Sequence, residues 1–143
     1  WLWEGICVPV WRWRRAMYND QRCRMDWCVK PAAEANHHPR AVLNGVADDV
    51  ITIRDAAPGE TIPLDASGSS DPDGDPLAFR WYVYPEAGTY EGEIAIPDAE
   101  SPSTAVTIPD DAAGTEIHVI LELRDKHPAA PLFDYRRLVV NVS

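Results

Sequence analysis

From Val42 to the C-terminus, apolar and polar residues alternate with a period of two, which is the period of a half-buried β-strand. Turn-forming groups rich in Pro, Gly and Asp interrupt this alternation about every 8–12 residues. The alternation predicts seven strands, over residues 49–55, 60–64, 77–84, 93–96, 103–108, 116–124 and 135–142. No helix-length period separates these strands, which excludes a parallel α/β sheet.

Seven short strands in about 100 residues predict a mostly β chain that forms an antiparallel, immunoglobulin-like β-sandwich. Trp81 lies near the middle of the third strand, where such sandwiches hold a central aromatic side chain. No Cys pair in this segment can link the sheets, so packing alone must hold them together. The alternation predicts these inward-facing residues: Ile51, Ile53, Ile62, Leu64, Leu77, Phe79, Trp81, Val83, Val106, Ile108, Ile117, Val119, Leu121, Leu123, Leu138, Val140 and Val142.

The first 40 residues have a different composition from the rest of the chain. They contain five of the six Trp, all three Cys, and seven Lys or Arg against four Asp or Glu. Residues 10–29 contain no Gly or Pro and predict an α-helix, which Pro31 ends because the residue before a proline avoids helical torsions. The helix has more aromatic surface than an isolated helix can bury, so we expect it to pack on the sheet or on another domain. The domain boundary is placed between residues 1–40 and 41–143.

Composition excludes several classes of function. The formal net charge of -10 argues against a nucleic-acid partner or an anionic membrane surface, because no broad basic face can neutralise phosphates. No apolar run approaches the ~20 residues of a membrane span. Three Cys without Cys-x-x-Cys spacing predict free or buried thiols, neither a disulfide framework nor a zinc site. The chain begins with Trp and shows no signal peptide, so we expect it to be the C-terminal piece of a longer protein.

The acidic turn between the second and third predicted strands carries Asp71, Asp73 and Asp75 in alternation with Pro and Gly. Three carboxylates in one turn can hold Ca²⁺, which prefers oxygen ligands. The turn is not a helix-loop-helix calcium site, because the twelfth position is Tyr82 where that site requires Glu. Asp-Pro and Asp-Gly also form tight turns through side-chain-to-backbone hydrogen bonds. A calcium site and a purely structural turn therefore both remain open.

The third predicted strand turns Arg80, Tyr82 and Tyr84 to the face opposite Trp81. Aromatic residues two apart form a flat strip with steps of about 7 Å, and sugar rings stack on such faces. Tyr90 in the following loop would extend this strip. The alternatives are that the strip binds carbohydrate or that the Trp-rich helix, or a further domain, covers it.

Nothing in the chain predicts catalysis. No Gly-x-Ser-x-Gly nucleophile motif occurs, and no His has an evident catalytic partner. His118 alternates with core residues and is expected to point outward. His37 and His38 are adjacent in an extended linker, where neighbouring side chains point apart and chelate a metal poorly.

The stretch LDASGSSDPDGDPLAFRWYVYPEAGTY resembles the second strand, turn and third strand of polycystic-kidney-disease-type (PKD) immunoglobulin-like modules of bacterial secreted proteins. Together with WRWRRAMYND, RMDWCV, EANHHPRAVLNG and LELRDKHPAAPLFDYRRLVV, it resembles the C-terminal part of bacterial cellulose-binding proteins whose N-terminal domain is nucleoside-hydrolase-like. The resemblance covers nearly the whole chain, and residues 21–23 depart from it.

This resemblance implies that residues 1–40 are the end of a hydrolase-like domain and that residues 41–143 are its C-terminal sandwich. It implies a secreted or periplasmic bacterial protein, associated with plant-polysaccharide breakdown, in which this region is a noncatalytic accessory domain. The expected partners are the upstream hydrolase-like domain and cellulose or another polysaccharide. The alternative is a fragment of a glycosidase or nucleoside-hydrolase-like enzyme whose active site lies upstream. No family catalytic residue corresponds to a position in this chain.

Overall fold

The computed structural model describes residues 2–143, without the side chains of residues 2–7 and of Pro9. The predictions that involve Trp1, Trp3 and Cys7 therefore lie outside the described residues. A helix, α1 (Leu2–Trp27), and a short 3₁₀ turn, η1 (Ala32–Glu34), precede the strands. The strands are β1 (Thr52–Ala56), β2 (Thr61–Asp65), β3 (Leu77–Val83), β4 (Ser103–Thr107), β5 (Glu116–Asp125) and β6 (Phe133–Val142).

The predicted helix over residues 10–29 is confirmed, although α1 begins earlier and ends at Trp27. Backbone N–H groups of residues 28–30 then bond to carbonyls of Met25 and Asp26, which closes the last turn before Pro31. No helix in the described part of the chain combines the length and the apolar composition that a bilayer crossing requires.

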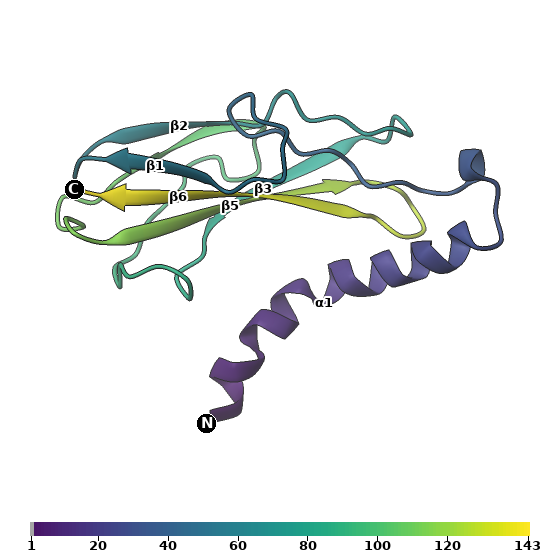
Figure 1. The fold of residues 1–143 in the computed structure, drawn as a ribbon, viewed down its shortest axis with the longest axis horizontal. Coiled ribbons are helices and arrows are strands. Elements are labelled where there is room, and N and C mark those ends of the chain that lie inside the picture. The colour runs from purple at the N-terminus through teal and green to yellow at the C-terminus, as the bar shows by residue number, and fades with distance from the viewer. Residues whose placement is uncertain (1) are drawn as a thin grey trace.

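The strands form two sheets, in the orders β1-β6-β5-β3 and β2-β4. Figure 1 shows β2 on one side of the larger sheet and α1 on the other. The main core lies between the two sheets and includes Ile62 and Val106 from the small sheet and Leu121 and Leu138 from the large one. The prediction for Trp81 is confirmed, because its side chain is 2% exposed and its indole N–H donates to the carbonyl of Ser101 at 2.9 Å.

The prediction of a seventh strand is wrong. Residues 93–96 form no strand, and Ile94 and Ile96 pack half-buried against the core. The backbone N–H of Trp81 bonds instead to the carbonyl of Ala99, at 2.7 Å. Two half-buried isoleucines produce the same alternation as a strand, but packing of side chains against a core does not require ladder hydrogen bonds.

The prediction of a purely antiparallel sheet is also wrong, because β1 pairs parallel with β6. In this register Thr52 lies beside Leu138, which faces the core, and Ile53 lies beside Val139 on the other face. Ile51 and Ile53 are consequently exposed, by 47% and 67%, although the alternation predicted that they point inward. A shift of one residue exchanges the two faces of a strand, and β1 is an edge strand with only one neighbour to impose the register.

Candidate functional site

The outward face of β3 lies directly beneath α1. Trp13 of α1 contacts three tyrosine rings, with centroid distances of 6.5 Å to Tyr82, 6.3 Å to Tyr84 and 4.8 Å to Tyr135. The contacts with Tyr84 and Tyr135 are edge-to-face, the arrangement that aromatic rings prefer. These contacts favour the alternative in which the Trp-rich helix covers part of the predicted strip.

Arg12 of α1 also covers part of the tyrosine strip. Its guanidinium carbon lies 4.9 Å from the ring centroid of Tyr84 and 5.7 Å from that of Tyr82, within cation–π range. Both terminal nitrogens of Arg12 donate to the carboxylate of Glu86, at 2.5 and 3.0 Å. This paired geometry fixes the plane of the guanidinium over the two rings.

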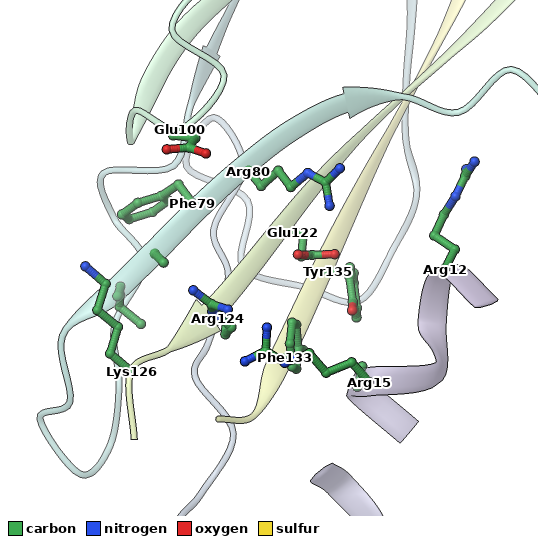
Figure 2. A pocket seen from close by; sticks show the side chains of 13 residues that line it. Arg12, Arg15, Phe79, Arg80, Glu100, Glu122, Arg124, Lys126, Phe133 and Tyr135 are labelled. Carbon is green, nitrogen blue, oxygen red and sulfur yellow. The ribbon is translucent and has the colours of Figure 1, made fainter. Parts of the chain in front are cut away.

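The register between β3, β5 and β6 places the other side chains of this face in rows. Arg80 of β3 pairs with Glu122 of β5, which in turn pairs with Tyr135 of β6, so these outward side chains form one row across three strands. The next row contains Ala78, Arg124 and Phe133 in the same order. Figure 2 shows Arg80, Glu122 and Tyr135 of the first row and Arg124 and Phe133 of the second, with Arg15 of α1 extending toward Phe133.

A hollow of about 680 Å³ lies between these rows and α1. It is lined by Arg12, Arg15, Ala16, Leu77, Ala78, Phe79, Arg80, Glu100, Glu122, Arg124, Lys126, Phe133 and Tyr135. The lining thus combines five cationic side chains, two carboxylates and three aromatic rings. Such a surface can bind a ligand that is flat and partly apolar and that also carries anionic or hydrogen-bonding groups.

Burial on this face changes the ionisation of three groups. Burial raises the pKa of Glu122, and the nearby charges of Arg80 and Arg124 act in the opposite direction. Burial, followed by the charge of Glu122, also raises the pKa values of Tyr82 and Tyr135 far above the ordinary range. Both phenols therefore stay neutral in this face, and Glu122 holds its charge less readily than an exposed carboxyl group does.

The structure does not bring Tyr90 to this face. Its ring packs half-buried against the core between the sheets, and its hydroxyl donates to Asp111 Oδ1 at 2.8 Å. Of the four residues predicted to bind carbohydrate, Arg80, Tyr82 and Tyr84 thus share a face, and only Arg80 lines the hollow.

The acidic turn is organised by its own backbone. Asp71 Oδ1 accepts hydrogen bonds from the N–H groups of Asp73 and Asp75, at 2.9 and 3.1 Å. The carboxylate of Asp73 instead accepts from the N–H of His37 at 2.7 Å and lies 2.9 Å from its ring Nδ1. Asp71 Oδ2 and Asp75 Oδ2 have no hydrogen-bond partner in the part of the chain that the structure describes. Among the described side chains, no three His, Cys, Asp or Glu residues gather as a metal site. Calcium binding at this turn therefore stays a prediction that the structure does not support with a ligand set.

The linker histidines attach α1 and the turn to the sandwich. His38 Nε2 lies 2.9 Å from Asp20 Oδ1 on α1, and His38 Nδ1 lies 2.9 Å from the carbonyl of Phe133. The ring of Trp27 stacks on His37 with 15° between the planes, and its N–H donates to the carbonyl of Asn36. The two histidine rings have different hydrogen-bond partners, although their centroids lie 6.4 and 6.1 Å from that of Trp27.

Sequence reasoning missed several of these contacts. The sequence did not reveal the partners of three histidines: His37 and His38 face aspartates, and His118 contacts Glu116 and Arg137. His118 is on the outward face of β5, as predicted, but it is only 4% exposed. Cys23 and Cys28 are free thiols, and Cys23 is buried against Ala130 and Leu132. The alternation in β6 marks Phe133 and Tyr135 as outward, but no local signal places them opposite Trp13 or Arg124.

Comparison with known proteins gives two findings. The family model for the C-terminal domain of the cellulose-binding protein Sde0182 matches residues 61–142. The chain is also similar to the solved structure of a nucleoside hydrolase-related hypothetical protein from Saccharophagus degradans that is associated with carbohydrate metabolism. The identity is 45% and the TM-score 0.89, over 92% of this chain and 32% of that protein. No curated protein sequence matches the chain.

Proposed function

The chain belongs to the family of the C-terminal domain of the cellulose-binding protein Sde0182, and from this premise we propose that it is a noncatalytic accessory domain of a secreted bacterial protein. In this proposal residues 41–143 form an immunoglobulin-like, PKD-like module. Residues 1–40 join it to a hydrolase-like domain upstream in the same polypeptide. The module packs on that domain and contacts cellulose or another polysaccharide.

The observation that carries this proposal is an exposed apolar stripe on α1. Val10, Trp11, Met17, Tyr18 and Met25 are each between 59% and 67% exposed. At 3.6 residues per turn these positions share one side of the helix. Cys23 and Trp27 lie on the other side of the helix, and Trp13 lies at the edge of the stripe, four residues before Met17. These three residues contact the sandwich and its linker. Exposed apolar side chains gathered on one side of a helix mark an interaction site.

Arg14 lies across two of the aromatic rings in this stripe. The guanidinium carbon of Arg14 lies 5.0 Å from the ring centroid of Trp11 and 5.3 Å from that of Tyr18, so one cation holds both rings. Rigid aromatic side chains lose little conformational freedom on binding and are favoured anchors at interfaces. The stripe thus has the chemistry of a docking surface.

The occupant we propose is the hydrolase-like domain itself. The solved relative is described as nucleoside hydrolase-related, and this chain spans only 32% of its length. A domain that precedes α1 in the same polypeptide is at high effective concentration and needs only modest affinity to stay docked. An apolar stripe on the connecting helix suits such a contact.

The noncatalytic role is supported by the chemistry of the described residues. Their hydrogen bonds join no His ring to a Ser hydroxyl or a Cys thiol, which nucleophilic catalysis of the triad type requires. The alternative function, part of a glycosidase or nucleoside-hydrolase-like enzyme with its active site upstream, is favoured by the description of the solved relative. Hydrolysis of a nucleoside or a glycoside by the chain alone would contradict the noncatalytic proposal.

Docking is tested by producing the chain and the hydrolase-like domain separately and measuring their association by light scattering and calorimetry. We expect a complex that the double variant Trp11→Glu, Tyr18→Glu weakens by at least about 100-fold, since buried aromatic anchors dominate interface energies. The matched control is Ile53→Glu on β1, which is 67% exposed but lies outside the stripe. Absence of a complex, or equal weakening by the control, would refute the docking proposal.

Polysaccharide contact is tested by retention of the chain on insoluble cellulose. We expect Arg80→Ala to reduce retention more than Tyr82→Ala, because Arg80 is exposed whereas Trp13 and Arg12 cover Tyr82. Circular dichroism confirms that each variant is folded. Retention that Arg80→Ala, Tyr82→Ala and Tyr84→Ala all leave unchanged would remove this face as the contact site.

A further inference from the structure

We propose that the hollow between α1 and the outward face of β3, β5 and β6 binds carboxylated sugar units of an acidic polysaccharide. This inference rests on the proposed function, since it names the class of glycan that the accessory domain contacts.

The first argument is an excess of unpaired positive charge. Arg12 is paired with Glu86, but Arg15, Arg80, Arg124 and Lys126 have no carboxylate within 4.0 Å among the described residues. The chain as a whole has a net charge of -10, and the remaining described Arg and Lys ion pairs lie outside the hollow. Unpaired cations gathered in one concave surface are therefore available to an anionic ligand.

The second argument is the aromatic surface beside these cations. The rings of Phe133 and Tyr135 are nearly parallel, with 9° between their planes and 6.2 Å between their centroids. Both rings line the hollow together with Phe79. Figure 2 shows Phe133 and Tyr135 beside Arg124 and Glu122, so flat apolar faces and charged groups meet in one place. Sugar rings present apolar faces and polar edges, and this surface matches both.

The position of Glu122 indicates where in the hollow the carboxylate of a ligand can lie. Glu122 is half-buried between Arg80 and Tyr135 in the cross-strand row, and burial raises its pKa. Its carboxyl group can accept hydrogen bonds from sugar hydroxyls but repels an anion placed directly over it. A ligand carboxylate therefore fits at the rim of the hollow, toward Arg80, Arg124 and Lys126.

Charge density favours an acidic glycan over a nucleic acid. A nucleic-acid duplex carries one charge per about 1.7 Å of its axis and needs a broad basic face, which a chain of net charge -10 does not offer. A glycan with at most one carboxylate per sugar unit carries its charges on one strand, at wider spacing than this duplex. A few Arg side chains can pair with such carboxylates in the fork geometry that guanidinium groups favour.

The test compares polygalacturonate with its methyl-esterified form, which has the same sugar rings without the charge. By calorimetry we expect the chain to bind polygalacturonate at least about tenfold more tightly than the ester, with affinity that falls as salt is raised. Arg80→Gln and Arg124→Gln should each weaken this binding about tenfold, because each removes a charge-assisted hydrogen bond. The matched control is Arg40→Gln, an exposed Arg outside the hollow, which removes the same charge without effect.

Three results would overturn the inference: no binding of polygalacturonate, equal binding of the methyl ester, or equally tight binding of single-stranded DNA. Thermal melting of both Arg variants shows whether lost binding is due to lost folding, and Arg80→Gln alters an exposed residue outside the core. Retention on neutral cellulose without binding of polygalacturonate would refute the inference and leave the proposed function standing.

Discussion

Removal of the Trp13 indole should detach α1 from the sheet without unfolding the sandwich. Trp13 makes three ring contacts, with Tyr82, Tyr84 and Tyr135. An aromatic pair contributes about 0.5–1.5 kcal/mol beyond the area that it buries. Three such pairs give about 1.5–4.5 kcal/mol, so we expect Trp13→Ala to lower the opening free energy of α1 by roughly 3 kcal/mol.

The assay is native-state hydrogen exchange, which reports the opening free energy of separate parts of a protein. Amide protons in the middle of α1 should lose protection in Trp13→Ala, while those of β5 and β6 keep theirs. The strands keep their protection because none of the α1 side chains that the structure describes belongs to the core between the sheets.

The same chain provides a matched control. Trp11→Ala makes an identical change two residues away on the same helix, but Trp11 is 62% exposed and faces away from the sheet. Exposed substitutions change stability by about 0.5 kcal/mol or less. Equal losses of protection in the two variants would refute the reasoning, because the effect would then reflect helix propensity and not contact with the tyrosines. Unchanged protection in Trp13→Ala would refute it as well.

Three further predictions concern the core, pH and calcium. Trp81→Ala should lower the free energy of unfolding in urea by about 3–5 kcal/mol, because it leaves a cavity between the sheets. Burial acts to raise the pKa of Asp20, but its contacts with Arg24 and His38 outweigh this and lower it. The attachment of α1 should therefore weaken as the pH falls below about 4, which is the pKa of Asp20 in the unfolded chain, toward its lower pKa in the folded chain. Hydrogen exchange of the α1 amides would measure this loss. Calorimetric titration with Ca²⁺ should give no heat, because among the described residues no three potential ligand side chains gather at this turn.

A specific result would contradict each of these predictions. A loss below about 1 kcal/mol in Trp81→Ala would show that the indole is not central to the core. In Asp20→Asn the attachment of α1 should no longer depend on pH in this range, and an unchanged profile would point to another carboxyl group. Heat on addition of Ca²⁺, together with a higher melting temperature that Asp71→Asn abolishes, would establish the calcium alternative.

The local alternation of residues was sufficient to predict much of the fold. It placed Trp81, Leu121 and Leu138 in the core and turned Arg80 and Tyr82 to the opposite face, because the two faces of a strand follow from adjacent residues alone. It failed at Ile53 and at residues 93–96, where the alternation is present but the pairing partner decides the outcome.

The sequence by itself determined which side chains share a strand face, and it identified the helix and the acidic turn. Only the tertiary structure decided that β1 runs parallel to β6 and that Trp13 lies against Tyr82 and Tyr135. It also decided that Arg80, Glu122 and Tyr135 form one row. These residues are separated by 42 and 13 positions along the chain, and the register that joins them comes from packing of the whole sheet. Alternation repeats every two residues in each strand and so cannot specify which residue of another strand lies opposite.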